Sequence, residues 1–154
     1  MHTDQALQLR AANLPEDIPS ILQIWRSAVE ATHHFLSQSE IGALAELIEN
    51  MYLDQVQVTV ALRGAKPVGF SGLADGKLEM LFVAPEAFGC GVGSALVHEA
   101  LAAHPHLEVD VNEQNPQAHG FYTHLGFEQI GRSELDGQGN PYPLLHLRYS
   151  GPRQ

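Results

Sequence analysis

The chain has 154 residues, a common size for one folded domain, and its 44% hydrophobic and 17% charged residues are typical of a globular protein. Eighteen acidic residues against eight basic ones give a formal charge of −10, which argues against nucleic acid or an anionic membrane as a partner. A single cysteine excludes an internal disulfide, and neither a signal peptide nor an apolar run of about 20 residues is present, so we expect a cytoplasmic protein with one domain over residues 1–154.

The first third of the chain predicts a strand followed by two helices. Residues 7–11 form the strand, and apolar residues at helical spacing follow over 18–29. Ser37 and Glu40 have the spacing of a capping box, which indicates the start of a second helix that carries apolar residues as far as Met51.

The middle of the chain predicts an antiparallel meander of three strands. Residues 56–62 alternate between apolar and polar or small side chains, and a turn leads from them into a second strand over 67–74. Asp75 and Gly76 are typical of a type I′ turn, which leads into the third strand over 77–83.

The remaining elements predict a parallel crossover and a final pair of strands. In chain order they are a helix over 92–103, a strand over 107–111, a short helix from Asn115 to Gly126, and strands over 127–132 and 144–149. The order βααβββαβαββ is that of an α+β fold with a βαβ unit in its middle.

A loop with three glycines separates the third strand of the meander from the next helix. Gly89, Gly91 and Gly93 allow successive backbone N–H groups to converge on an anion at the start of that helix. A flexible turn would use the same residues, so the glycines alone do not identify a site. The loop is not a Walker A motif, because no lysine follows Gly93, and the spacing of a Rossmann fingerprint is absent.

Two segments together resemble the GNAT N-acetyltransferases, a family whose acetyl-CoA motif is Q/R-x-x-G-x-G/A. The segment FGCGVG at 88–93 matches the two small positions, and Asn115 followed by FYTHLGF at 121–127 matches a second family landmark. The stretches ATHHFL, DVNEQNPQAHGFY and GRSELDGQGNPYPLLHL are similar to the bacterial YjaB-type subgroup, and the resemblance extends from Leu7 to Tyr149. Phe88 departs from the motif, because the family has Gln or Arg at that position.

The resemblance implies a GNAT fold, in which a mixed and largely antiparallel sheet of six to seven strands is flanked by about four helices. It also implies acetyl-CoA as the acetyl donor, an amine as the acceptor, no metal, and a monomer or homodimer. The residues that it implies for CoA binding are Leu81, Phe82, Val83, Phe88, Gly89, Cys90, Gly91, Val92, Gly93, Ser94, Asn115 and Tyr122. Because this loop contacts phosphate largely through backbone N–H groups in the family, Phe88 should weaken CoA binding without abolishing it.

Tyr122 is the candidate for the acid that protonates the departing thiolate. The resemblance places it there, and a phenol with a pKa of about 10 can supply a proton to a thiolate whose conjugate acid has a pKa of about 8.5. Periodicity by itself favours a structural role in which Tyr122 packs with Phe121 against the sheet. Asn115, similarly, could cap its helix as well as contact CoA.

Glu79 is the candidate for the general base that takes a proton from the acceptor amine. Strict strand alternation places it on one face with Leu81 and Val83, opposite Leu78 and Met80. The alternative is an exposed charge on a strand, since a base would need a raised pKa, which the sequence does not show. The resemblance also implies that the backbone N–H of Val83 holds the thioester carbonyl.

The nine histidines do not have the spacing of a metal site, and most are expected on the surface. The resemblance implies an acceptor pocket between the two N-terminal helices and the last strands, where His33, His34, Phe35 and His146 could contact the substrate. Cys90 has no assigned histidine partner, so we interpret it as a small loop residue and not a nucleophile.

The expected function is transfer of the acetyl group of acetyl-CoA to a primary amine by direct attack in a ternary complex. The acceptor could be a small amine, an amino acid or an amine of a protein. A non-catalytic module that binds acyl-CoA for sensing is the alternative, because it would use the same loop and the same asparagine.

Overall fold

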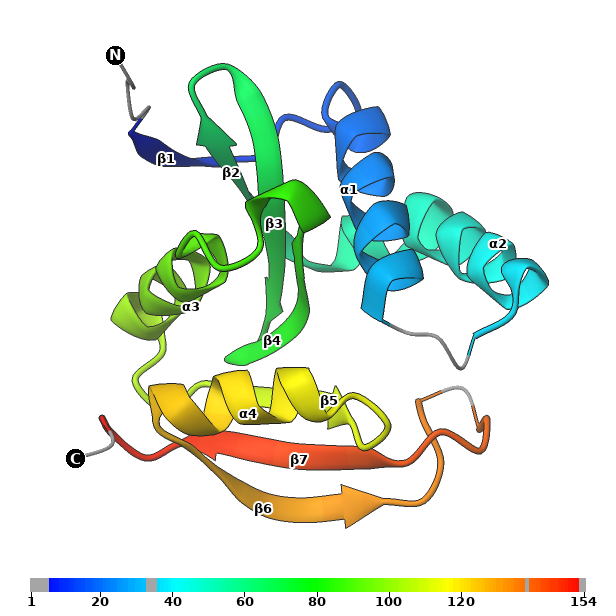
Figure 1. Ribbon diagram of the computed structural model, residues 1–154, viewed down its shortest axis with the longest axis vertical. Coiled ribbons are helices and arrows are strands. Elements are labelled where there is room, and N and C mark those ends of the chain that lie inside the picture. Colours follow the sequence, from blue (N-terminus) through cyan, green and yellow to red (C-terminus); the bar gives the residue numbers. More distant parts are fainter. Residues whose placement is uncertain (1–5, 33–35, 138, 153–154) are drawn as a thin grey trace.

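The computed structural model of the protein describes residues 6–32, 36–137 and 139–152. These residues form a seven-stranded sheet in the order β1-β2-β3-β4-β5-β7-β6, together with four α-helices (Figure 1). All neighbouring strands are antiparallel except β4 and β5, which are parallel. The predicted α+β class and the predicted order of elements are confirmed.

The bounds of the elements follow the sequence pattern closely. The strands are β1 (Leu7–Ala11), β2 (Gln57–Arg63), β3 (Lys66–Ala74), β4 (Lys77–Val83), β5 (Glu108–Asn112), β6 (Phe127–Ser133) and β7 (Leu144–Tyr149). The α-helices are α1 (Ile18–Thr32), α2 (Gln38–Leu47), α3 (Val92–Ala103) and α4 (Pro116–Leu125), and short helical turns lie at η1 (Ile48–Tyr52), η2 (Leu53–Gln55) and η3 (Pro85–Ala87). No helix in the described part of the chain is long and apolar enough to cross a bilayer.

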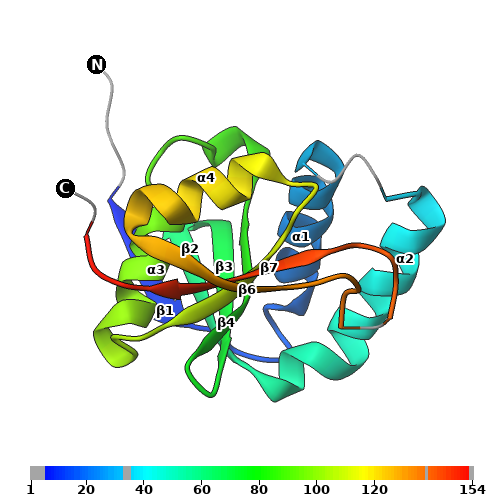
Figure 2. The ribbon, with the colours of Figure 1, turned by 90° about the horizontal axis from the view of Figure 1, so that it is seen from below.

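The helices cover opposite faces of the sheet, as Figures 1 and 2 show. Helices α1 and α2 pack on β2 to β4 through a core in which Trp25 contacts Phe82 edge-on, with ring centroids 6.4 Å apart. Helices α3 and α4 pack on the other face, where the core includes Val97, Val109 and Leu147. On the side of β5, β7 and β6 that faces away from α4, Asp110 and Ser133 both contact His146.

The N-terminus of α2 has the predicted capping box, but its α-helical part ends four residues earlier than the apolar pattern indicates. Ser37 Oγ accepts the Glu40 N–H at 3.1 Å, and Glu40 Oε1 accepts the Ser37 N–H at 2.9 Å. After Leu47 the chain continues as a π-turn in which the Leu53 N–H donates to the Ile48 carbonyl. An α-helix would place residues five apart on widely separated sides, whereas the wider turn lets both Ile48 and Leu53 reach the core.

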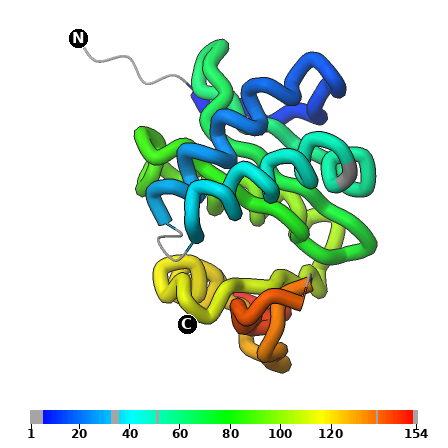
Figure 3. Tube along the Cα trace, turned by 90° about the vertical axis from the view of Figure 1, so that its right-hand side faces the viewer, coloured from blue at the N-terminus to red at the C-terminus, as the bar shows by residue number. Residues whose placement is uncertain are grey.

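Strands β4 and β5 pair over two residues and then separate. Lys77 lies opposite Glu108 and Leu78 opposite Val109, and no further pairs join these strands among the described residues. Figure 3 shows the result, in which the part from β1 to β4 and the part from β5 to β7 diverge. Because β5 continues to pair with β7, the backbone of β4 beyond Leu78 has a sheet partner only in β3. The separation therefore leaves backbone donors and acceptors available at the middle of the sheet.

Candidate active site

The glycine-rich loop joins β4 to α3 and presents the start of that helix. Gly89 has φ 76° and Gly91 has φ 83°, which are conformations that side chains other than glycine rarely adopt. Gly91 is the N-cap residue of α3, so the first N–H groups of the helix lack intrahelical acceptors and are available to an anion. A Cβ built at either glycine would meet no atom within 4 Å, so a ligand can approach the loop. Phe88 is 46% exposed and Cys90 is also exposed.

The edge of β4 that faces β5 offers polar groups to a ligand. The residues expected to contact CoA on this strand, Leu81 to Val83, pair with β3 on one side and have no β5 partner on the other. Across the separation, Asn112 Oδ1 at the end of β5 is buried and makes no hydrogen bond, alone among the side-chain N and O atoms of the described residues. The open edge of β4 therefore offers backbone donors and acceptors to an extended ligand.

Glu79 is the extra residue of a β-bulge, and this corrects its expected neighbours. Leu73 pairs with Leu78 and Gly72 pairs with Met80, so Glu79 has no opposite residue on β3. Leu78 therefore lies on the α3 side of the sheet and Met80 on the α1 side, whereas strict alternation predicted one face for both. The bulge leaves the Glu79 carboxylate exposed at the point where β4 and β5 separate.

Tyr122 has a buried ring and an accessible hydroxyl. The side chain is 6% exposed and packs edge-on against Phe121 and Phe127, with centroids 4.9 and 5.3 Å away. Its hydroxyl has no hydrogen-bond partner in the described chain and is not among the buried unpartnered atoms, so solvent reaches it. Burial raises the pKa of Tyr122 above its usual value, which keeps the phenol protonated near neutral pH. Packing and a role as a proton donor are therefore compatible.

The remaining predicted site residues are Asn115, at the start of α4, and the residues expected to contact the acceptor. Asn115 Oδ1 accepts the Ala118 N–H at 3.1 Å and caps α4, so the capping role is confirmed and the contact with CoA stays a prediction. His33, His34 and Phe35 lie outside the described residues. His146 is on β7, where its contact with the acceptor also stays a prediction.

A cavity of about 840 Å³ lies beside Glu79, between α2, β4 and the loop from β6 to β7. Four carboxylates and no basic side chain are among the described residues that line it: Leu36, Glu40, Ala43, Leu44, Leu47, Tyr52, Gln55, Val56, Ala74, Asp75, Glu79, Met80, Asn112, Asp136, Gly137, Asn140 and Tyr142. The Tyr142 hydroxyl donates to Glu40 Oε2 at 2.5 Å across this cavity. That hydrogen bond and two more from Ser37 hold the pKa of Glu40 below its usual value, so the wall carries negative charge at neutral pH.

Most residues of this cavity were not predicted from the sequence. Glu40 and Tyr142 are 102 positions apart, and no local pattern connects them. Asp110, which lies outside the cavity lining and contacts His146, gives no signal in the sequence either, because it takes a polar position in the alternating strand Glu108–Asn112. In the described residues, no group of three or more His, Cys, Asp or Glu side chains could hold a metal ion.

Comparison with known proteins identifies the family. Residues 54–129 match the acetyltransferase (GNAT) domain. The peptidyl-lysine N-acetyltransferase YjaB of Escherichia coli is 44% identical over 137 residues, which are 88% of this chain and 92% of that protein. The peptidyl-lysine N-acetyltransferase YiaC of the same organism is 32% identical, over 74% of this chain and 79% of that protein.

The solution structure of apo YjaB from Escherichia coli superimposes with a TM-score of 0.87 at 41% identity, covering 95% of this chain and 99% of that one. The predicted GNAT fold and the resemblance to the YjaB-type proteins are thereby confirmed, and an acetyltransferase is supported over a sensing module. The acetyl donor of the family is acetyl-CoA and the acceptor is an amine. The chain therefore belongs to the GNAT family of N-acetyltransferases.

Proposed function

We propose that the acceptor is the ε-amine of a lysine in a peptide or protein, acetylated while acetyl-CoA is bound to the same molecule of enzyme. The observation that carries this proposal is the acidic wall of the cavity beside Glu79, which includes Glu40, Asp75 and Asp136 and no basic residue among its described lining. Negative charge attracts a protonated lysine and disfavours anionic acceptors. The names of YjaB and YiaC as peptidyl-lysine acetyltransferases support the same acceptor.

The size of the cavity favours an acceptor larger than a free amine. A volume of about 840 Å³ exceeds what one lysine side chain fills, and the apolar part of the wall, which includes Leu44 and Met80, suits the stem of a lysine and its neighbours. The cavity also reaches Asp136 on the loop from β6 to β7, so its acidic wall extends well beyond Glu79.

In the proposed mechanism, Glu79 accepts the proton of the lysine ammonium, directly or through one water. The neutral amine then attacks the thioester carbonyl, whose oxygen the backbone N–H of Val83 stabilises. When the tetrahedral intermediate collapses, the C–S bond breaks and the Tyr122 hydroxyl donates a proton to the departing thiolate. The attacking nitrogen loses its second proton to solvent, from which the phenol is reprotonated. The glycine-rich loop from Phe88 to Ser94 holds the pyrophosphate through backbone N–H groups, and the site is that of a cytoplasmic enzyme supplied with acetyl-CoA.

The test compares acceptors that share an amine and differ in what surrounds it. Release of CoA thiol is followed with an N-terminally blocked lysine peptide, the same peptide with arginine in place of lysine, free lysine, and a small diamine. The proposal expects the highest kcat/KM for the blocked lysine peptide and none for the arginine peptide. A higher kcat/KM for free lysine or the diamine than for the blocked peptide would contradict a protein acceptor.

A matched pair of variants connects this test to the cavity. Glu40→Gln removes one charge from the wall and should raise the KM of the lysine peptide without changing the affinity for acetyl-CoA. Glu128→Gln removes an equivalent charge from β6, outside the cavity lining, and should leave that KM unchanged. Equal KM values for both variants would show that the charge of the wall does not select the acceptor.

A further inference from the structure

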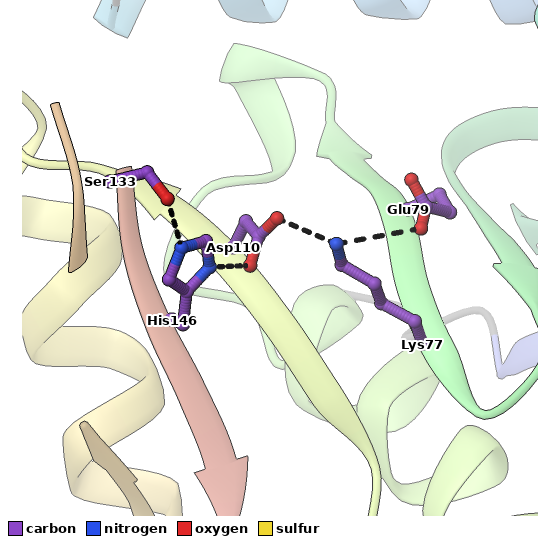
Figure 4. Close-up of polar contacts among 5 residues, drawn as sticks. All are labelled: Lys77, Glu79, Asp110, Ser133 and His146. Atoms are coloured by element: carbon purple, nitrogen blue, oxygen red, sulfur yellow. Dashed lines mark hydrogen bonds and ion pairs between the residues drawn. The ribbon is translucent and has the colours of Figure 1, made fainter. Parts of the chain in front are cut away.

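A row of polar side chains crosses four neighbouring strands and ends at Glu79 (Figure 4). Ser133 on β6 contacts His146 on β7, with 2.6 Å between Oγ and Nε2. His146 Nδ1 lies 2.6 Å from Oδ1 of Asp110 on β5, and Lys77 Nζ on β4 lies 2.6 Å from Oδ2 of the same carboxylate. The Lys77 ammonium is also 3.8 Å from Oε1 of Glu79.

The directions of these hydrogen bonds follow from the ionisation of Asp110. Burial opposes that ionisation, but the hydrogen bonds from Lys77 and His146 outweigh it and hold the pKa of Asp110 below its usual value. Burial likewise disfavours the Lys77 ammonium, but the hydrogen bond to Asp110 and the negative charges of Asp110, Glu79 and Glu108 together outweigh it and raise the pKa of Lys77. A carboxylate only accepts, so His146 donates from Nδ1, and in a neutral imidazole Nε2 then accepts the hydroxyl proton of Ser133.

Lys77 thus forms ion pairs with two carboxylates and a hydrogen bond with one of them, Asp110. The distance of 2.6 Å to Asp110 is that of a charge-assisted hydrogen bond, whereas 3.8 Å to Glu79 is too long for one. An ammonium bonded to Glu79 would stabilise that carboxylate, lower its basicity and occupy an oxygen that the amine proton must reach. Among the described residues, the only other carboxylate near Lys77 on this side of β5 is that of Glu108. It forms an ion pair with Arg148 at 3.5 Å.

We propose that Asp110 is a positioning residue of the acetyl-transfer reaction, because it takes the hydrogen bond of the Lys77 ammonium and so keeps Lys77 from hydrogen-bonding to the Glu79 oxygen that accepts a proton from the amine. The proposal rests on the role of Glu79 as the base in the proposed function. His146 and Ser133 hold the Asp110 carboxylate from the opposite side and fix its orientation. In this arrangement His146 acts on the base through two intervening side chains, and its own contact with the acceptor is not required.

The test is a cycle of two substitutions. Asp110→Asn releases Lys77, which can then hydrogen-bond to Glu79, and kcat/KM should fall about tenfold, a fraction of the 10²–10⁴-fold that general base catalysis contributes. The acid limb of the pH profile should move to lower pH, because the base has become weaker. Lys77→Met alone should stay within about threefold of the wild type, and the double variant should regain that level. A loss of fold would not be rescued by removing a second charge.

One further variant serves as a control. Glu108→Gln removes a carboxylate from the same side of β5 without releasing Lys77, and its kcat/KM should be unchanged. Full activity of Asp110→Asn, or a double variant as slow as Asp110→Asn, would overturn the proposal. If Asp110→Asn does not fold, Lys77→Met decides, because a loss beyond threefold would show that Lys77 is itself required.

The same measurements distinguish this proposal from the proposed function. A large loss in Glu79→Gln together with full activity in Asp110→Asn would remove the role of Asp110 and leave the base assignment standing. Full activity in Glu79→Gln would remove the base assignment and the role of Asp110 with it. Acetyl-CoA affinity, measured by calorimetry on each variant, should stay constant throughout, since none of the substituted side chains is part of the glycine-rich loop.

Discussion

Replacing Tyr122 by phenylalanine deletes one oxygen from a side chain whose ring is packed and whose hydroxyl is not bonded. The ring contacts with Phe121 and Phe127 survive the change, and no hydrogen bond of the described chain is lost. The free energy of unfolding should therefore change by less than about 1 kcal/mol. Because the fold stays intact, a loss of kcat in this variant reports on the hydroxyl.

The magnitude of the rate effect follows from the pKa of the phenol. Burial raises the pKa of Tyr122, while the thiol that it protonates has a pKa of about 8.5, so full proton transfer from the phenol is uphill. The contribution should then lie near the lower end of general acid catalysis, about 10²-fold in kcat, which is about 2.7 kcal/mol. Acetyl-CoA affinity should be unchanged, because the hydroxyl acts on the thiolate that forms during the reaction.

The assay is thiol release at saturating acetyl-CoA and lysine peptide, with thermal unfolding measured on the same samples. Tyr149→Phe is the matched control, because its ring packs against Phe127 in the same aromatic cluster, with centroids 5.4 Å apart. Its kcat should stay within about twofold of the wild type. A kcat for Tyr122→Phe within threefold of the wild type would refute the reasoning, since it would mean that water protonates the thiolate as effectively.

Three other substitutions test separate parts of the molecule. Glu79→Gln should lower kcat/KM most at low pH, where the amine arrives protonated, and an unchanged pH profile would mean that the proton leaves by another route. Gly91→Asp should weaken acetyl-CoA binding about tenfold or more, because it places a negative charge near the pyrophosphate. Gly91→Asn has the same shape without the charge, and its Kd for acetyl-CoA should stay within about threefold of the wild type. Equal Kd values for the two variants would place the phosphates elsewhere. Gly126→Ala should destabilise the fold by roughly 2–4 kcal/mol in a denaturant titration, because φ is 115° and the new Cβ would lie 2.0 Å from the Gly151 carbonyl oxygen. Gly120→Ala inside α4, the helix that Gly126 ends, meets no atom within 4 Å and should be neutral or stabilising, so a similar loss in both variants would contradict the steric argument.

Local sequence patterns determined the elements and the position of the glycine-rich loop. The turn at Asp75 and Gly76 was predictable because a type I′ turn needs positive φ at both positions, and the observed values are 52° and 78°. The capping box of α2 and the glycine at the end of α4 were also predictable, because each depends on hydrogen bonds to backbone groups only a few residues away. The loop at 88–93 combined such a pattern with a family motif, which is why its place at the start of α3 was found.

The tertiary structure alone decided where the polar side chains meet. A β-bulge has no fixed pattern in the sequence, so the prediction that Leu78 and Met80 share one face was wrong and the surroundings of Glu79 were not foreseen. The acidic cavity joins Glu40 to Tyr142, and the polar row joins Lys77 to Asp110, across 102 and 33 positions of the chain. Contacts of this kind depend on strand order and register, which are fixed by the packing of the whole sheet and not by the residues nearby in the sequence.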